Sequence, residues 1–327
     1  LDGVLVGTRC SLHATMAVPV LERGLPLFLE KPVATCYDDL RRLRDVGLPH
    51  KDRVVVSFPL RVSPMAQAAK EIIDSGKLGT IEHVRAWNDV PYGWHYFQWW
   101  YRNEDETGGL FLQKATHDFD CINYLLGLAP RRVCAMKTKR IFRGDMPADQ
   151  PCNQCRREDC LESIDNLLRR GVMTPDKPYT RMCCFAVDTG NEDAPSALVE
   201  YETGMHMAYS QNFVVRRRPA AARGAKFIGY KGSLEFDWYT DELKVCMHHE
   251  PRVDVTTIDS SALAHAGGDA RMAANFIQVI RGQAPSNTPL DTGLLSVLMC
   301  LKARDSAEKG TFEEIDCTDA LGREAAA

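Results

Sequence analysis

The order of apolar and amphipathic segments in the first 80 residues constrains the fold more than any other feature of this sequence. Short apolar runs have the length and composition of buried strands, and the segments between them have helical periodicity. The predicted order is strand 1–8, helix 11–24, strand 25–32, helix 36–47, strand 53–60 and helix 63–76. Alternation of this kind is typical of parallel βαβ units. We therefore predict an α/β domain built on a parallel sheet.

A different texture begins near residue 80, where longer strand-like runs follow one another with short turns. Such runs predict a large, open and mainly antiparallel sheet. We expect helices at 107–127, 269–282 and 292–310 to cover one of its faces. The sequence therefore predicts a second domain, of mixed α and β structure, that begins near residue 80.

Polar side chains stand where the predicted strands of the first domain end. Thr8, Lys31 and Arg61 each follow a strand, and in a parallel sheet the loops at the carboxyl ends of the strands build the ligand crevice. Lys31 is the most specific of them because Glu30 and Pro32 flank it, and a proline cannot donate to a sheet ladder. A lysine that is partly desolvated beside a cationic ring has a lowered pKa. An isolated lysine more often points into water, and that alternative stays open.

One face of the predicted helix at 107–127 is polar. At 3.6 residues per turn, Gln113, His117 and Asp120 fall within an arc of roughly 60°, and Lys114 lies at its edge. A solvated helix face gives the same pattern. A Gly-Gly step before the stripe permits close approach of the backbone, and the ordinary pKa of histidine suits proton transfer at neutral pH. These two features favour a catalytic face.

Aromatic side chains crowd residues 92–101. Such side chains suit stacking against the C–H faces of sugar rings or a subunit interface. Packing in a core or an interface accounts for most of them. We assign one or two to a ligand, with Trp100 as the candidate substrate-binding residue.

Five of the twelve cysteines cluster between residues 152 and 184, and the other seven are scattered singly. We expect the scattered ones to be reduced and to pack as small apolar residues. The clustered thiols have a spacing that can supply four ligands to a structural zinc or an iron–sulfur cluster, and unpaired loop thiols are the alternative. The predicted ligands are Cys152, Cys155, Cys160 and Cys183, with the choice between Cys183 and Cys184 left open.

The composition is that of an ordinary globular chain, with 45% hydrophobic and 26% charged residues. Its 40 basic and 44 acidic residues lack the basic bias of proteins that bind nucleic acid. No apolar run approaches the length of a membrane span, and the segment LDGVLVGTRC has no basic region followed by an apolar one, as a signal peptide has. We expect a cytoplasmic protein without a nucleic-acid or membrane partner.

Five segments, taken in order, resemble the Gfo/Idh/MocA oxidoreductases, the superfamily of glucose-fructose oxidoreductase and inositol dehydrogenase. They are VLVGTRCSLHATMAVPVLERGLPLFLEKPVA, FPLRVSP, SGKLGTIEHVRAW, TGGLFLQKATHDFDCINYLLG and HAGGDARMAANFIQVIRG. The E-K-P step after a strand, paired with G-G-x7-H-x2-D further along the chain, is the most specific part of the resemblance, which covers nearly the whole chain.

The resemblance implies a fold and an activity. Residues 1–79 would be the C-terminal part of a Rossmann domain that binds NAD or NADP, and residues 80–327 a substrate-binding and oligomerisation domain with a Cys-rich insert at about 145–185. The fold class is then α/β plus α+β. The implied reaction is hydride transfer at a hydroxyl-bearing carbon of a small carbohydrate, cyclitol or polyol. The implied assembly is a homo-oligomer, either a dimer or a tetramer.

The resemblance also assigns roles to residues. Lys31 and His117 would be catalytic, His117 as general acid/base, and Asp120 would orient His117 or cap the helix region. The expected cofactor-binding residues are Thr8, Ser11, His13, Glu30, Lys31, Pro32 and Arg61. The expected substrate-binding residues are Lys31, Trp100, Gln113, Lys114 and His117. The Cys-rich insert looks similar to one found in a subset of the family, which favours a bound metal.

Three departures from the family pattern leave other functions open. The G-x-G-x-x-G loop that holds the pyrophosphate is absent, so the sequence is either a fragment of a longer polypeptide or unable to hold a dinucleotide tightly. Gln113 replaces an acidic residue of many members, and Arg9-Cys10 replaces their Pro-Asn or Pro-Asp. The alternatives are an NAD-dependent glycosidase or lyase that acts by transient oxidation, and a catalytically silent interaction protein.

Overall fold

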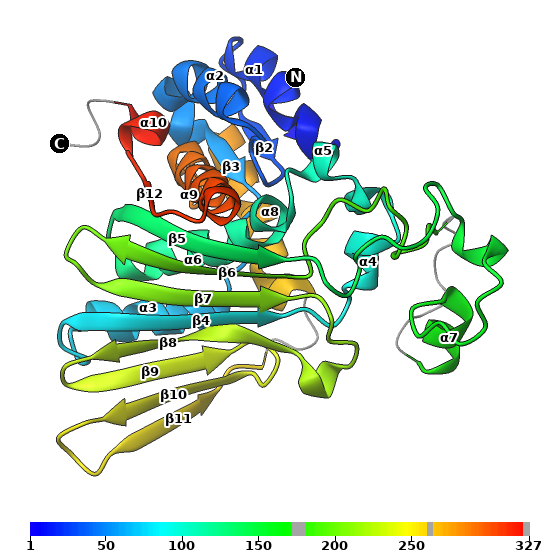
Figure 1. The fold of residues 1–327 in the computed structure, drawn as a ribbon. Helices are drawn as coiled ribbons and strands as arrows, with labels where there is room; N and C mark the ends of the chain where they lie inside the picture. Colours follow the sequence, from blue (N-terminus) through cyan, green and yellow to red (C-terminus); the bar gives the residue numbers. More distant parts are fainter. Residues whose placement is uncertain (172–180, 260–263, 323–327) are drawn as a thin grey trace.

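The computed structural model describes residues 1–171, 181–259 and 264–322. Its first 60 residues form a three-stranded parallel sheet in the order β1-β2-β3 (Figure 1). The strands are β1 (Val4–Val6), β2 (Leu27–Leu29) and β3 (Val54–Val56). The prediction of a parallel sheet is therefore confirmed, with strands shorter than the apolar runs that contain them.

Both faces of this small sheet are buried by helices, as parallel strands require. Val54 and Val56 belong to the main core, whereas Val55 packs in a separate cluster with Met272 and Phe276 of α8 (Gly268–Ile280). This alternation follows the period of two along a strand. The other helices of this part are η1 (Cys10–Leu12), α1 (His13–Leu21), α2 (Tyr37–Gly47), η2 (Leu48–Arg53) and α3 (Pro64–Asp74).

The second sheet has nine strands in the order β11-β10-β9-β8-β4-β7-β6-β5-β12, and all neighbours except β4 and β7 pair antiparallel. The prediction of a large, mainly antiparallel sheet is confirmed. Its strands are β4 (Ile81–Asp89), β5 (Pro130–Thr138), β6 (Ala194–Tyr201), β7 (His206–Asn212), β8 (Ala222–Gly229), β9 (Gly232–Asp237), β10 (Glu242–Met247), β11 (Val253–Thr257) and β12 (Glu313–Glu314).

Helices cover one face of the large sheet and leave the other open (Figure 1). The long helix α9 (Leu290–Lys309) packs against β5 and α6 (Thr116–Leu126) and also reaches α2 and β3, so it joins the two sheets. The shorter helices are α4 (Trp94–Phe97), η3 (Trp100–Arg102), α5 (Glu104–Thr107), η4 (Phe111–Ala115), η5 (Cys152–Gln154), α7 (Ile164–Arg169), η6 (Arg218–Ala220), η7 (Ala264–Gly267) and α10 (Thr318–Leu321).

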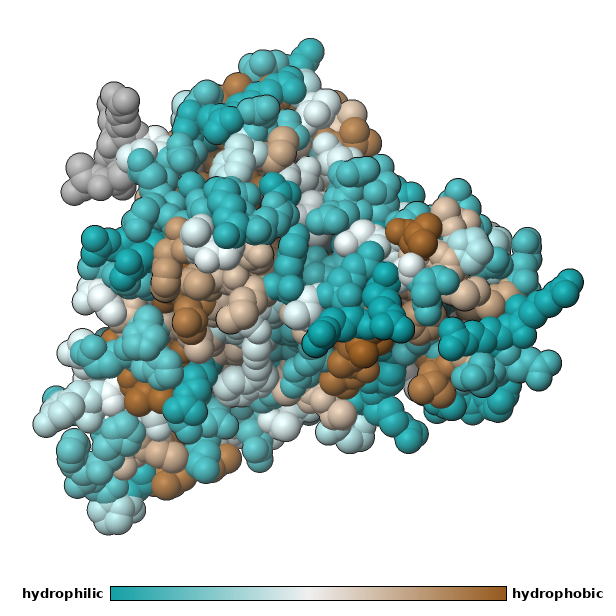
Figure 2. Space-filling view, viewed as in Figure 1, coloured by the Kyte–Doolittle hydropathy of each residue, from teal (hydrophilic) through white to brown (hydrophobic). Residues whose placement is uncertain are grey.

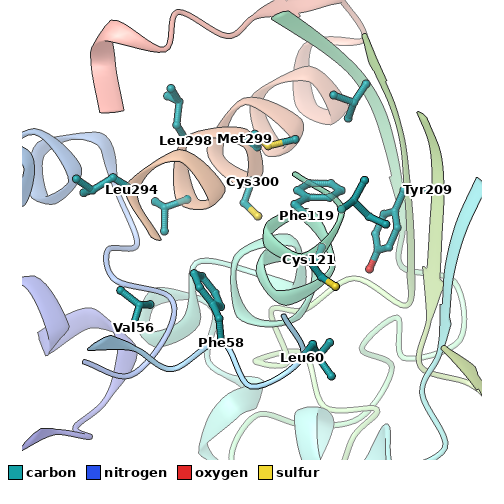
Figure 3. Close-up of a cluster of buried hydrophobic side chains, with 14 of the residues drawn as sticks. Val56, Phe58, Leu60, Phe119, Cys121, Tyr209, Leu294, Leu298, Met299 and Cys300 are labelled. Atoms are coloured by element: carbon teal, nitrogen blue, oxygen red, sulfur yellow. The ribbon is translucent and has the colours of Figure 1, made fainter. Parts of the chain in front are cut away.

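One hydrophobic core runs through both sheets at α9. Figure 3 shows Leu294, Leu298 and Cys300 of this helix beside Phe119 of α6 and Val56 of β3. All five side chains are almost completely buried. The predicted boundary at residues 79 and 80 stays a prediction, because β4 does begin the large sheet there while α8 and α9 return to the small one.

The open face of the large sheet carries exposed apolar side chains, and the cysteines of the chain are reduced. Exposed hydrophobic side chains lie on the open face of the large sheet, among them Met136 of β5 and Leu198 of β6, and Figure 2 shows hydrophobic and neutral side chains over these strands. Among the described residues, no helix has the length and apolar content needed to span a bilayer. All twelve cysteines are described and none forms a disulfide; of the seven scattered ones, Cys36 is exposed, which differs from the expectation of buried thiols.

Candidate active site

Two adjoining cavities lie at the carboxyl ends of the parallel strands. The larger has a volume of about 950 Å³ and is bounded by the end of β2, by η4 and by α8. The smaller, of about 630 Å³, lies over the ends of β1 and β2. Glu30, Lys31, Tyr101 and Gln113 line both cavities. Strand ends of parallel sheets are where such folds bind ligands, so these cavities form the candidate active site.

Lys31 lies between the two cavities. Its Nζ donates a hydrogen bond to the carbonyl oxygen of Gln113 at 2.7 Å, which links the end of β2 to the turn η4. Burial and, to a smaller extent, the positive charge of Lys114 lower the pKa of Lys31 to about 8, against the opposing effects of Cys10 and Glu30. The expectation that Lys31 faces a crevice agrees with this position.

The turn η4 is π-helical over Phe111–Ala115 and leads directly into α6. Before it, Gly108 and Gly109 both have positive φ angles, and a Cβ on Gly108 would lie 2.5 Å from a methyl group of Leu112. The buried carboxylate of Glu192 accepts hydrogen bonds from the backbone N–H groups of Leu110 and Phe111 at 3.0 and 3.1 Å. The glycines and this cap bring the polar face of the turn to the cavity.

His117 lines the larger cavity from the first turn of α6. It is buried, its ring packs edge-on against Phe58, and its Nδ1 has no hydrogen-bond partner among the described residues. Burial and then the charge of Lys31 place the pKa of His117 well below the ordinary value for histidine. The ring is therefore neutral at neutral pH and able to accept a proton.

Asp120 does not hydrogen-bond to His117, although we expected it to orient that ring or cap the helix region. Neither oxygen of Asp120 has a hydrogen-bond partner among the described residues, and Oδ2 lies 3.3 Å from Nε of Arg61. Burial raises the pKa of Asp120 to about 7 despite the charge of Arg61. Arg61 in turn contacts Thr292 and the ring of Tyr124 and lines a separate cavity of about 420 Å³. The strand exit at Arg61 thus leads away from the candidate active site.

Lys114 is buried on the wall of the larger cavity. Its Nζ donates to the hydroxyl of Tyr92 at 2.6 Å and lies 4.8 Å from the centre of that ring and 5.8 Å from the ring of Tyr96. Burial, and next the charge of Arg223, lower the pKa of Lys114 well below its ordinary value. Gln113 also lines this cavity, and its side-chain Oε1 is buried without a partner among the described residues.

The smaller cavity gathers part of the predicted cofactor site. Thr8, His13, Glu30 and Lys31 line it. Nδ1 of the buried His13 lies 2.7 Å from the carbonyl oxygen of Pro32, and Nε2 lies 3.2 Å from that of Thr8. Because burial lowers the pKa of His13, a neutral ring donates through Nδ1 at the shorter contact. His13 thereby ties the loop after β1 to the loop after β2.

Of three other predicted residues, Ser11 and Pro32 line neither cavity, and Trp100 lines the smaller one. Ser11 donates a hydrogen bond to Glu106 and lines neither cavity. Pro32 contributes its carbonyl to His13 but is not in the lining of either cavity. Trp100, which we expected on the substrate, lines the smaller cavity, with the guanidinium of Arg9 stacked 4.0 Å from its ring centre.

Sequence reasoning missed an aromatic wall and a segment of α8. Tyr92, Trp94 and Tyr96 line the larger cavity, and Tyr96 also belongs to a second hydrophobic core with Phe97 and Phe213. The expectation that most of these aromatic residues pack in a core agrees with the position of Tyr96, and the assignment of Trp100 to the substrate stays a prediction. His265 and Asp269 also line the cavity. They lie in the segment HAGGDARMAANFIQVIRG. This segment contributed to the family resemblance, but the sequence analysis assigned no site role to its residues.

The five clustered cysteines line one further cavity of about 730 Å³ in the segment that projects beside the large sheet (Figure 1). Part of the predicted insert, residues 172–180, lies outside the described residues. In the described part of the chain, no group of three or more His, Cys, Asp or Glu side chains is arranged to hold a metal ion. The cysteines are thus gathered as the sequence suggested, but their side chains do not have coordination geometry.

Comparisons with known proteins agree with this geometry. Residues 66–235 match the family model described as the GFO/IDH/MocA C-terminal domain. The Bacillus subtilis protein YteT is 26% identical over 273 residues, which are 75% of this chain and 62% of that protein. Inositol 2-dehydrogenase of Rhizobium meliloti is 28% identical over 137 residues, 41% of this chain and 39% of that protein. The chain thus spans less than two thirds of the length of these curated relatives.

Solved structures show the same fold. Levoglucosan dehydrogenase, solved with NADH and levoglucosan, superposes with a TM-score of 0.74 at 18% identity and covers 96% of this chain and 80% of its own. Myo-inositol 2-dehydrogenase from Lactobacillus plantarum gives a TM-score of 0.67 at 16% identity, with 97% and 81% covered. Because the family model matches more than half of the chain, and because the fold agrees with it, this protein belongs to the Gfo/Idh/MocA family.

Proposed function

We propose that this protein is an NAD(P)-dependent oxidoreductase that transfers hydride between nicotinamide and a hydroxyl-bearing carbon of a sugar, cyclitol or sugar derivative. The observation that carries the proposal is the convergence of Lys31, from the end of β2, and His117, from the start of α6, on one cavity of about 950 Å³. The names of the inositol and levoglucosan dehydrogenases among its relatives and structural neighbours support the substrate class.

The two side chains have complementary states for oxidation of an alcohol. His117 is neutral at neutral pH, so it accepts the hydroxyl proton. Lys31 is an ammonium below a pKa of about 8, so it stabilises the alkoxide that develops on the same oxygen. In the reverse direction His117 returns the proton. The unpartnered Nδ1 of His117 and Oε1 of Gln113 are the buried polar atoms that a bound substrate would satisfy.

The smaller cavity suits the cofactor. It lies over the carboxyl ends of β1 and β2 and opens onto Lys31, where a dinucleotide binds in this class of sheet. Thr8, His13, Glu30 and Lys31 would hold the cofactor, and Trp100 lines the same space. When bound, nicotinamide supplies the hydride acceptor. The chain's part is to position the substrate carbon and move its proton.

The test is steady-state turnover in the complete protein with NAD+ and NADP+ against a panel of sugars and cyclitols. We expect net formation of reduced nicotinamide that is lost in Lys31→Ala and in His117→Ala while both variants keep their melting temperature. Full activity in either variant would remove that residue from the mechanism. Cleavage of a glycoside without net reduced nicotinamide would instead support transient oxidation followed by elimination.

We also propose a structural zinc or iron–sulfur cluster at Cys152, Cys155, Cys160 and Cys183. The four thiols line a single cavity, and thiolates at this number and spacing suit either metal centre. The described side chains would have to move together to reach coordination distance. Elemental analysis after purification without chelator tests this. The expected result is about one zinc, or several irons, per chain. If the protein contains neither zinc nor iron, the proposal is wrong.

Finally, we propose that the open face of the large sheet joins copies of the chain in a homo-oligomer, a dimer or a tetramer. Met136 and Leu198 are exposed on neighbouring strands of this face, and association of copies there would remove these apolar side chains from water. Light scattering of the complete protein and of Met136→Glu tests it. A smaller species in the variant is expected, whereas a wild-type monomer would contradict the proposal.

A further inference from the structure

The wall of the larger cavity carries two buried lysine amino groups that have no carboxylate partner among the described residues. Lys31 donates to the carbonyl of Gln113 at 2.7 Å, and Lys114 donates to the hydroxyl of Tyr92 at 2.6 Å. Both acceptors are neutral. In the described part of the chain, neither lysine lies within 4.0 Å of a carboxylate oxygen as a salt bridge.

The carboxylates nearest to this wall are engaged with other groups. Asp118 accepts hydrogen bonds from Arg223 at 2.8 Å, from Asn88 at 2.8 Å and from Tyr209 at 2.7 Å. The cavity lining itself has two carboxylates. Asp269 lies 2.8 Å from Nδ1 of His265, and Glu30 stands at the boundary with the smaller cavity. No described carboxylate therefore compensates the charge that Lys31 or Lys114 carries when it is protonated.

An excess of buried positive charge is costly unless a ligand compensates it. Burial lowers the pKa values of both lysines, because it disfavours their charged forms. The faces of Tyr92 and Tyr96 offset part of it at Lys114. A carboxylate against Lys114 would offset the rest and would form a short, charge-assisted hydrogen bond in a site that excludes much of the water.

We propose that the substrate is a sugar acid, whose carboxylate binds Lys114 while its reacting hydroxyl faces Lys31 and His117. This inference rests on the proposed dehydrogenase function and specifies its substrate class. Lys114 binds and orients the substrate in this scheme. The aromatic wall of Tyr92 and Tyr96 then contacts the sugar ring, as aromatic side chains in carbohydrate sites do.

The experiment compares acids with their neutral counterparts in the complete protein: D-glucuronate against D-glucose, and D-galacturonate against D-galactose. We expect kcat/KM to be higher for an acid by roughly 10–100-fold, the value of one hydrogen bond to a charged group. In Lys114→Met this preference should vanish, mainly through KM, and Lys114→Arg should restore part of it. Lys309→Met, which removes an exposed lysine at the end of α9, is the matched control. It should change neither the preference for the acid in kcat/KM nor the KM.

Thermal shift measurements with the same four sugars test binding of the acids to Lys114 independently of turnover. Each acid that binds should stabilise the wild type and Lys309→Met but not Lys114→Met. If no sugar reduces NAD(P)+ while the acids still bind through Lys114, the proposed function fails and the anion site stands. If neutral sugars bind and react as well as acids, or if Lys114→Met keeps the acid preference, the anion site is contradicted while the dehydrogenase function stands.

Discussion

Two neighbouring groups of buried ionisable side chains in this protein differ in their hydrogen-bond partners. Asp118 and Arg223 form an ion pair at 2.7 Å, and Asn88 and Tyr209 complete the hydrogen bonds of the carboxylate. Close by, Lys31 and Lys114 donate to neutral acceptors, and Nδ1 of His117 has no hydrogen-bond partner in the described part of the chain. Buried polar groups are nearly always satisfied in folded proteins. The difference indicates that the first group holds the fold and the second awaits a ligand.

Asp118 and Asp120, two carboxylates on the same helix, also differ in their hydrogen-bond partners. Both oxygens of Asp118 accept hydrogen bonds, whereas Asp120 has only the 3.3 Å contact with Arg61 and a pKa raised to about 7 by burial. Neither carboxylate hydrogen-bonds to His117. Among the described residues, no carboxylate orients the imidazole, and its position follows from packing against Phe58 and from the helix that carries it.

The largest expected effect is a loss of stability when the ion pair of Asp118 and Arg223 is broken. Arg223→Met leaves Asp118 buried without its counter-ion, and breaking a buried pair in this way costs about 3–5 kcal/mol. Urea denaturation should show this loss of unfolding free energy. Lys226→Met, which breaks the partly exposed pair with Glu235, is the control and should cost at most about 1 kcal/mol. Equal, small losses would mean that the Asp118 network does not hold the fold.

The second effect concerns catalysis. His117→Ala should lower kcat by roughly 10²–10⁴-fold because it removes the proton acceptor. Its unfolding free energy should change far less than that of Arg223→Met, because Nδ1 of His117 makes no hydrogen bond that folding depends on. Turnover and urea denaturation of the same preparations separate the two. If His117→Ala showed normal turnover and a large loss of unfolding free energy, His117 would support the fold and would have no role in catalysis.

A third prediction concerns pH. Lys31 is protonated below its pKa of about 8, so kcat/KM for oxidation should fall as pH rises through that value, when the ammonium is lost. At the acid end, activity should persist below the ordinary pKa of histidine, because the pKa of His117 is lowered by burial. Profiles of kcat/KM report groups of the free enzyme. Lys31→Arg should remove the alkaline fall if it is active at all. An unchanged alkaline fall in an active Lys31→Arg would assign it to another group.

The smallest expected effect is a gain. Lys114→Met should stabilise the ligand-free protein by about 0.5–2 kcal/mol, because it removes a buried ammonium without a counter-ion. The folded-state pKa of Lys114 lies below its unfolded value, so the wild type gains stability as pH rises, and the difference between the two proteins should shrink toward the ordinary lysine pKa of about 10.4. Melting curves across this range measure it. A destabilised Lys114→Met at all pH values would show that the lysine supports the fold.

The sequence predicted the two sheets because their signals are local. Three valines in a row at β3 and the alternation along β4 to β10 reflect burial on two faces and on one face, which hydrophobic periodicity reports directly. It did not predict that α8 packs on the small sheet. That contact joins residues some 200 positions apart, such as Val55 and Phe276, and no local pattern encodes it.

The candidate site was predictable in part for the same reason. Lys31 and His117 stood out through their motifs, and the structure places both on one cavity. Arg61 and Asp120 also stood at the expected strand exit and helix face, but they pair with each other. Helical periodicity gives a direction for a side chain and not its partner, so it could not show that Asp120 faces Arg61 while His117 faces the cavity.

The most direct measurement is a crystal structure of the complete protein with nicotinamide cofactor and a bound sugar acid. The expected result is a substrate hydroxyl within about 2.6–3.2 Å of both Nζ of Lys31 and a ring nitrogen of His117, with the hydride-accepting ring on the side of Thr8 and Glu30. A substrate bound away from these two nitrogens, with the cavity between β2 and α6 filled by water alone, would contradict the assignment.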